Sequence, residues 1–366
     1  MNITFEREGL LRPLTYVTGV VERRQTVPVL SYVLLRSESD GLTLTGTDLE
    51  TEVVVSASGE TNDRTDLTLP ARKLLDICRA LPEDAKITIR TEGEKAVVRT
   101  GRSRFTLRTL PSSDFPSIQT TDWDLRLSVD AAALRQVLSE TQFCMAQQDV
   151  RYYLNGVLLE VVTGALRAVA TDGHRMALSQ IPAEGKLTEG RQVIMPRKAV
   201  LEISRILGDT TGRIELLFSP NHVRVQAPGL TFTAKLIDGR YPDYSKVLPA
   251  RQSKRLLLDR EALRVALNRV AILSNEKFRG ARLVLEPGIL KFVAHNPEQE
   301  EAQDELSVEY SGEPMEVGFN VSYLIDATSA LNTEKVVVGL NDPNSSCLIH
   351  GPDQEFPRYV VMPMRL

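Results

Sequence analysis

One helical pattern occurs three times along the 366-residue chain. In its first copy, residues 69–81, the apolar side chains have the spacing of one face of an α-helix: Leu74, Leu75, Ile77, Cys78 and Leu81. The pattern returns at residues 196–207 and 320–331. The closing leucines, Leu81, Leu207 and Leu331, are about 125 residues apart, and a period of that length is a whole domain. The sequence therefore predicts three similar domains.

A second repeated helix opens each third of the chain. Its three copies share a Leu-Arg pair: residues 8–14, 131–137 and 260–266. Short apolar runs follow each copy and predict paired strands. We therefore predict an α+β fold in which each of the three domains has two helices packed on small antiparallel sheets. Polar connections that contain proline set the expected boundaries, and the predicted domains are residues 1–122, 123–250 and 251–366.

Charge is distributed unevenly over the chain. The net charge of −4 argues against a nucleic-acid binder, and an aromatic content of 5% disfavours stacking on single-stranded bases. The repeated helices are nevertheless basic: Arg72, Lys73, Arg79, Arg197, Lys198 and Arg205, joined by Arg12, Arg135 and Arg264. These residues form either ordinary solvated helix faces or a basic lining that attracts phosphates without reading bases.

Cysteine usage and the N-terminal sequence indicate the compartment. Cys78, Cys144 and Cys347 have no CxxC spacing, which favours reduced thiols in a cytosolic protein. The first residues become charged at once, and no apolar run reaches 18 residues. We expect a cytoplasmic protein without a signal peptide or a membrane partner.

Two constellations contain the residue types of a catalytic site. Asp172 and His174 are two residues apart, but general acid–base chemistry would also need a nucleophile or a metal within reach. A histidine in a turn between strands is the favoured interpretation. The carboxylates of residues 298–301 could hold Mg²⁺, although such groups more often form a solvated or partner-facing edge. Because the sequence also has no P-loop and no GxSxG elbow, we expect no catalytic site, metal or cofactor.

Over nearly its whole length the chain resembles the bacterial sliding clamps, the beta subunits of the replicative DNA polymerase III. The resemblance rests on seven stretches: Leu44–Glu50, Gln148–Gly156, Ala170–Arg175, Ile272–Lys277, Asn296–Glu301, Gly318–Tyr323 and Tyr359–Leu366. It implies a head-to-tail homodimeric ring with helices inside and sheets outside, which encircles duplex DNA. It also implies a non-enzymatic processivity factor that an external, ATP-driven clamp loader opens.

The resemblance further implies a peptide-binding cleft between the second and third domains. Its expected partners are the DNA polymerase III alpha subunit, other polymerases and repair proteins, each through a short Gln-led motif that ends in Leu and Phe. The matching positions are Arg151, Tyr153, Leu154, Thr171, Gly173, His174, Arg175, Pro242, Val247, Asn320, Tyr323, Ser346, Val360, Met362, Pro363, Met364 and Arg365. Three more positions differ from the form expected of the family: Met176, Lys246 and Asn344.

Two other sets of residues carry over from the family. Contacts with DNA are implied for Arg24, Gln148, Tyr152 and Tyr153. The dimer contact is implied to join two different surfaces: Lys73, Ile77, Phe105 and Leu107 on one protomer, and Ile272, Leu273, Glu298, Glu300 and Glu301 on the other.

Two rival functions remain open at this stage. One is a DNA-processing enzyme that uses the acidic turn of residues 298–301, and the other is a three-domain scaffold without a nucleic-acid role. Retention on circular DNA, with loss when that DNA is cut, separates a clamp from both.

Overall fold

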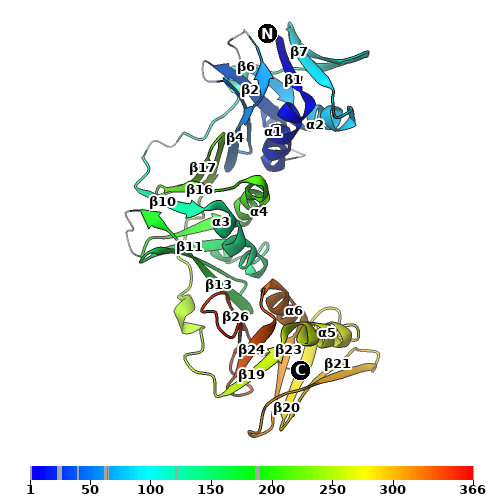
Figure 1. The fold of residues 1–366 in the computed structure, drawn as a ribbon, viewed down its shortest axis with the longest axis vertical. Coiled ribbons are helices and arrows are strands. Elements are labelled where there is room, and N and C mark those ends of the chain that lie inside the picture. The colour runs from blue at the N-terminus through cyan, green and yellow to red at the C-terminus, as the bar shows by residue number, and fades with distance from the viewer. Residues whose placement is uncertain are drawn as a thin grey trace. The chain divides into compact units, whose positions relative to one another are not determined.

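The computed structural model describes residues 2–22, 27–38, 41–61, 64, 66–119, 122–185 and 190–365 (Figure 1). The chain divides into two units, each of which is described by itself. Unit 1 contains Met1–Ala132, Glu184–Lys186 and Leu201–Leu236, and unit 2 contains Ala133–Ala183, Leu187–Val200 and Ile237–Leu366.

The described residues form six α-helices, at the positions that the two repeats predict. They are α1 (Arg7–Val20), α2 (Ala71–Ala80), α3 (Ala131–Ser139), α4 (Arg197–Ile206), α5 (Arg260–Ala271) and α6 (Val321–Ala330). In α2 the side chains of Leu74, Leu75 and Cys78 are buried, whereas Arg72, Lys73 and Arg79 on the other face are exposed. Short 3₁₀ turns lie at Pro28–Ser31, Ser112–Asp114, Gln142–Cys144, Tyr152–Leu154, Leu207–Asp209 and Tyr244–Lys246.

A strand precedes the first helix of each third of the chain. The sequence pattern had predicted that each third begins with the helix. These strands are β1 (Asn2–Glu6), β10 (Leu125–Asp130) and β19 (Lys254–Asp259). In each strand every second side chain is buried, so the sequence has the alternating pattern of a strand. This pattern lies just before the residues in which the repeat was recognised. Asp259 caps α5, because its carboxylate accepts a hydrogen bond from the Ala262 amide at 2.7 Å.

Unit 1 contains two antiparallel sheets. The larger has the order β14-β10-β16-β17-β18-β4-β3-β2-β6, and the smaller β5-β1-β7-β8-β9. Its further strands are β2 (Tyr32–Glu38), β3 (Gly41–Thr47), β4 (Thr51–Ala57), β5 (Gly59–Glu60), β6 (Asp66–Pro70), β7 (Lys86–Glu92), β8 (Lys95–Thr100), β9 (Ser103–Arg108), β14 (Glu184–Gly185), β16 (Arg213–Phe218), β17 (His222–Ala227) and β18 (Leu230–Lys235). The pairing of β18 with β4 places Phe232 opposite Val53. A single sheet thus joins strands that were predicted to lie in different domains.

Unit 2 repeats this arrangement. Its larger sheet has the order β15-β11-β12-β13-β26-β25-β24-β19, and its smaller sheet β22-β21-β20-β23. The strands are β11 (Gly156–Val162), β12 (Ala165–Thr171), β13 (Arg175–Pro182), β15 (Gln192–Pro196), β20 (Gly280–Glu286), β21 (Ile289–His295), β22 (Glu301–Ser307), β23 (Met315–Asn320), β24 (Lys335–Leu340), β25 (Cys347–His350) and β26 (Arg358–Val361). Here β13 pairs with β26, and Met176 faces Val360. The C-terminal strand is therefore part of the sheet that begins in the predicted central domain.

Gly46 on β3 allows helix α1 to lie close to the sheet. A Cβ atom at this position would stand 2.6 Å from the carbonyl oxygen of Val17 and 3.0 Å from its Cβ. Val17 is fully buried in the helix, so neither backbone can move away without disturbing the core.

Replacing Gly46 with alanine is expected to lower the free energy of unfolding by about 1–3 kcal/mol, because overpacking a close helix–sheet contact has that typical cost. Denaturant unfolding measures the effect. Thr43→Ala, on the opposite face of the same strand, serves as the control and should change stability less. Equal stability of Gly46→Ala and wild type would show that the contact relaxes freely.

The three cysteines are free and buried. Burial raises the pKa of the Cys78 and Cys347 thiols to about 12, so both stay protonated at neutral pH and are chemically inert. A search for helices that could cross a membrane finds none within the described residues.

Candidate functional site

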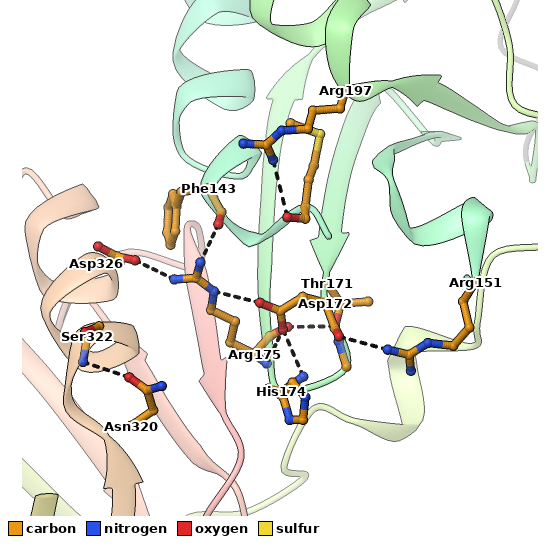
Figure 2. A network of polar contacts seen from close by, with 12 residues as sticks. Phe143, Arg151, Thr171, Asp172, His174, Arg175, Arg197, Asn320, Ser322 and Asp326 are labelled. Atoms are coloured by element: carbon orange, nitrogen blue, oxygen red, sulfur yellow. Dashed lines mark hydrogen bonds and ion pairs between the residues drawn. The ribbon is translucent and has the colours of Figure 1, made fainter. Parts of the chain in front are cut away.

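The turn Thr171–Arg175 joins β12 to β13 and is held by its own hydrogen bonds (Figure 2). The Asp172 carboxylate accepts bonds from the amides of His174 at 2.9 Å and Arg175 at 3.0 Å. The Thr171 hydroxyl donates to the Arg175 carbonyl at 2.6 Å. Asp172 therefore shapes the backbone, and the Asp172–His174 pair is a turn, as the favoured interpretation of the sequence held.

Arg175 is the centre of the polar network in Figure 2. Its guanidinium donates to Asp172 at 3.1 Å, to Asp326 on α6 at 2.5 Å and to the Phe143 carbonyl at 2.7 Å. It also lies 4.4 Å from the ring centroid of Tyr323. With its side chain only 14% exposed, Arg175 has little capacity left for a ligand. Arg175 thus links the turn Thr171–Arg175 to α6, and its contact with a peptide stays a prediction.

Arg151 supports the same turn from the other side. It donates two hydrogen bonds to Asp149, at 3.0 and 2.8 Å, and a third to the carbonyl of Asp172 at 3.1 Å. Gly173 has a φ of +90°, and a Cβ atom there would stand 2.9 Å from the Arg151 guanidinium. Glycine adopts this left-handed backbone without steric cost, and the absence of a Cβ atom leaves room for the Arg151 guanidinium.

The Asp149 carboxyl should stay ionised to an unusually low pH. Hydrogen bonds from Arg151 lower its pKa to about 2, so the contribution of this pair to stability is present above about pH 4 and is lost as the pH falls through about 2. An NMR titration of the Asp149 carboxyl carbon measures the midpoint. In Arg151→Ala the midpoint should rise toward the ordinary value of about 3.9. An ordinary pKa in the wild type would mean that the ion pair does not form in solution.

The apolar residues predicted to line the cleft mostly lie beneath its surface. Leu154 is only 2% exposed, and Met176 and Val360 are equally buried in one cluster with Leu178 and Tyr241. They therefore form a core that supports the surface, not contact points. The apolar side chains that remain accessible at these positions belong to Pro242, to Val247 and to the C-terminal segment, which we define as Met362–Arg365.

The C-terminal segment is fixed at two points. The Met362 amide donates to the His174 carbonyl at 2.9 Å, and the Met364 amide donates to the Gly318 carbonyl at 2.8 Å. The segment therefore runs from the turn Thr171–Arg175 to β23. Met362, Pro363 and Met364 are half-buried and Arg365 is exposed. The C-terminal segment therefore packs on the rest of unit 2.

The other predicted cleft residues surround this segment in unit 2. Asn320 caps α6 by accepting a bond from the Ser322 amide at 3.0 Å. Tyr153, Tyr323 and Ser346 are half-buried, while Pro242 and Lys246 are exposed. Lys246 pairs with Asp243 at 3.2 Å, which leaves part of its side chain accessible.

An identical turn occurs in unit 1 at Thr47–Thr51. The Thr47 hydroxyl donates to the Thr51 carbonyl at 2.9 Å, and Asp48 accepts bonds from the amides of Glu50 and Thr51. The Lys235 amide donates to the Glu50 carbonyl at 2.8 Å, as Met362 does to His174. The side chains differ, because Lys235 and Glu50 form an ion pair at 3.4 Å. The repeat thus preserves the backbone, whereas the apolar surface occurs in the unit 2 copy.

The predicted DNA contacts lie mainly on one exposed loop. Gln148 is exposed with a φ of +54°, and the rings of Tyr152 and Tyr153 meet edge to face at 5.8 Å. Sequence reasoning did not single out Val150, which is 95% exposed beside them. Arg24 lies outside the described residues.

Several of the basic helix residues have structural partners. Arg72 donates to the Val21 carbonyl at 3.0 Å, and Arg205 donates to the carbonyls of Thr15 and Tyr16 and pairs with Glu202. The Val21 carbonyl lies at the C-terminal end of α1, where a positive charge is favourable, whereas Thr15 and Tyr16 lie earlier in that helix. The recurrence of basic residues is therefore partly explained by helix packing.

The remaining basic positions differ in exposure. Arg197 is half-buried and its guanidinium is 3.4 Å from the Met145 carbonyl (Figure 2). Lys198 is also half-buried, and Arg79 is exposed in the last turn of α2.

The residues predicted for the dimer contact lie on exposed edges of each unit. In unit 2, Ile272 is 77% exposed just beyond α5, and Leu273 beside it is half-buried. In unit 1, Lys73 is exposed, and Ile77 and Phe105 are half-buried. Leu107, in contrast, is already buried within its own chain, so little of its side chain is left for a partner.

The acidic turn of residues 296–301 is also organised by its own bonds. The Glu300 amide donates to the Asn296 side chain at 2.9 Å, and His295 lies 3.4 Å from Glu301. Within the described ranges, no three His, Cys, Asp or Glu side chains are grouped so as to hold a metal ion. Glu298 is exposed, as a partner-facing edge requires.

Comparisons with known proteins cover the whole chain. Sequence models described as the N-terminal, central and C-terminal domains of the DNA polymerase III beta subunit match residues 1–119, 128–243 and 245–365. A beta sliding clamp of Pseudomonas aeruginosa is 52% identical, with 100% of both chains covered. The crystal structure of the DNA polymerase III subunit beta from that organism matches with a TM-score of 0.96 at 51% identity, again over both full chains. Another matching structure, with the same score, identity and coverage, is described as a sliding clamp from P. aeruginosa bound to griselimycin.

Proposed function

Because this chain belongs to the family of bacterial beta sliding clamps, the beta subunits of DNA polymerase III, we propose that two copies form a closed ring around duplex DNA and tether polymerases to it. The observation that carries this function is the match of three consecutive clamp domains over the full length of the chain. The family is a non-catalytic processivity factor. The two carboxylate-containing turns therefore serve structure and binding, not chemistry.

The ring would be closed by the edges of two different sheets. Strand β9 is the last strand of its sheet and carries Arg104 and Arg108, whereas β22 is the last strand of another and carries Glu301, Asp304 and Glu305. A basic edge and an acidic edge can pair by backbone hydrogen bonds with favourable charge. A contact between unlike surfaces closes twice in a ring of two protomers. Ile272 and Leu273 would add the apolar part of the contact.

Duplex DNA would be held weakly and without sequence preference. We propose that Gln148, Tyr152 and Tyr153 contact the backbone, together with Arg24 and the basic residues Arg72, Arg79, Arg197, Lys198 and Arg205. Arg205 pairs with Glu202, which offsets its charge, whereas Arg72 donates to a neutral carbonyl and keeps its charge. A weak attraction suits a ring, because topology prevents dissociation.

The peptide surface would lie along the C-terminal segment and the turn Thr171–Arg175. Half-buried methionines beside an ordered turn supply an adaptable apolar surface, which suits several competing partners. By family, these are the polymerase alpha subunit, other polymerases and repair proteins, and a clamp loader opens the ring in the cytoplasm. The domain boundaries at residues 122/123 and 250/251 stay predictions.

Retention on circular DNA tests the proposed function. Protein loaded on a nicked circle by a clamp loader should stay bound through gel filtration and should be lost at once when the circle is cut. The expected difference is near-complete retention against near-complete loss, because the link is topological. A matched control uses linear DNA with both ends blocked by bound protein, on which retention should return. Equal loss from circular and linear DNA would contradict the function.

A further inference from the structure

We propose that a pocket on the outward face of β20 and β21 is a second subsite for the partner chain, and that the C-terminal segment forms one side of it. The pocket would bind an apolar residue and a neighbouring carboxylate of the partner chain. The proposal rests on the peptide-binding role proposed above and extends it. The pocket has a volume of about 460 Å³. It is lined by Asn275, Phe278, Gly280, Arg282, Val293, His295, Met364 and Arg365.

The pocket is continuous with the proposed peptide surface. Met362 is bonded to the turn at His174, and two residues later Met364 is bonded to Gly318 on β23. Met364 and Arg365 then form one side of the pocket. A partner chain that lies along the C-terminal segment would therefore come next to the pocket.

The floor and one wall of the pocket are apolar. Val293 points to the outward face of β21, directly opposite Arg282 in the strand register, and the absence of a side chain at Gly280 leaves room above the sheet. Phe278 is 56% exposed at the rim, where the Lys277 ammonium lies 5.3 Å from the centroid of its ring. Val293, Phe278 and Met364 would together cover one aliphatic or aromatic side chain.

The charged groups of the rim determine what else can bind. The lining residues include two arginines, Arg282 and Arg365, and no aspartate or glutamate. Arg282 already pairs with the Glu316 carboxylate at 3.0 Å, so the arginine that can receive a carboxylate of the partner chain is Arg365, which is exposed. An arginine beside an apolar floor favours a carboxylate next to an apolar residue, so an acidic–aromatic pair that flanks the core motif fits this pocket best.

The test compares a core peptide with extended forms of it on the full-length protein, by calorimetry. The core begins with Gln and ends in Leu-Phe. A Phe-Asp pair, joined through two glycines, is added at either end, and a Ser-Ser pair on the same linker is the control. One of the two Phe-Asp extensions should raise affinity about 3- to 10-fold, since one more apolar side chain is buried and the linker is ordered at a cost.

Three variants show where the gain arises. Val293→Asp places a negative charge in the pocket and should abolish the gain, and so should Phe278→Ala, which removes an exposed wall and threatens the fold less. Val284→Asp is the matched control, because it lies on the same outward face of β20 but outside the pocket, and it should keep the gain. Core-peptide affinity should be equal in all three.

Each outcome has one meaning. A gain that survives both Val293→Asp and Phe278→Ala, or no gain from either extension, overturns the subsite while leaving the peptide surface in place. Failure of the core peptide to bind the wild type would instead overturn the proposed peptide-binding role, and the subsite with it.

Discussion

Leu273→Ala is expected to turn the dimer into monomers at low micromolar concentration. Leu273 and Ile272 lie just beyond the end of α5, where Ile272 is 77% exposed and adjoins the proposed contact with the partner's β9. Truncating a leucine that is buried in an interface costs about 2–5 kcal/mol. A ring of two protomers makes the contact twice, so the loss applies at both contacts. Sedimentation velocity over a dilution series measures the change.

The control is Leu257→Ala, which removes another exposed leucine of the same unit, 51% exposed on β19. It should leave the dimer as tight as the wild type. If Leu273→Ala sediments as a dimer at the same concentrations, then the proposed interface is wrong. Raised salt should weaken the wild-type contact as well, because Arg104 and Arg108 of β9 face acidic residues of β22 in the proposed pairing.

The helices could be predicted because each has a periodic signal that three copies repeat, and the apolar runs after the first helix of each third predicted some of the strands. The strands β1, β10 and β19 were missed because the comparison of the copies began at the helices. The continuous sheets were beyond sequence reasoning for a different reason. Nothing in Phe232 or Val360 indicates that its strand pairs with a strand of the preceding predicted domain, since strand partners are set by tertiary packing.

The candidate site was predicted as a set of residues but not as an arrangement. Arg175 illustrates the difference. Its bond to Asp172 is local and could be expected, but Asp326 lies 151 residues further along the chain and has no pattern that marks it as a partner. Leu154 likewise has the apolar character of a peptide contact, although it is buried in the core. Residue type predicted which segments form the candidate site. Only the packing shows which of their side chains are buried beneath it and which are accessible to a ligand.

The turns Thr47–Thr51 and Thr171–Arg175 have the same backbone, but the peptide surface is proposed only at the second. Thr47–Thr51 and Thr171–Arg175 share their hydrogen bonds, so the backbone is a property of the domain. In the first copy, Lys235 and Glu50 occupy the positions of Met362 and His174 and pair with each other. An ion pair at that place offers no apolar contact. The peptide surface proposed for the second copy therefore depends on the side chains that the C-terminal segment adds.

Deletion of Met362–Leu366 is expected to abolish binding of a Gln-led peptide that ends in Leu-Phe. The deletion removes two half-buried methionines that border the proposed peptide surface. Burial of each apolar side chain contributes roughly 1.5–3 kcal/mol, so affinity should fall at least about 100-fold. The strand β26 ends at Val361 and keeps its pairing with β13 and β25, so the fold should survive. Calorimetry on the truncated protein measures the loss.

Two controls separate contact from structure. The double variant Met362→Ser, Met364→Ser keeps the length of the segment and the amides that bond His174 and Gly318, and it should lose nearly as much affinity as the deletion. Sedimentation and retention on circular DNA should remain as in the wild type for both proteins, because the proposed dimer contact lies on other edges. Unchanged peptide affinity in the deletion would place the partner site elsewhere. A dimer that dissociates on deletion would mean that the segment stabilises the fold. A double variant that binds the peptide normally would assign the effect of the deletion to the backbone bonds and not to the methionine side chains.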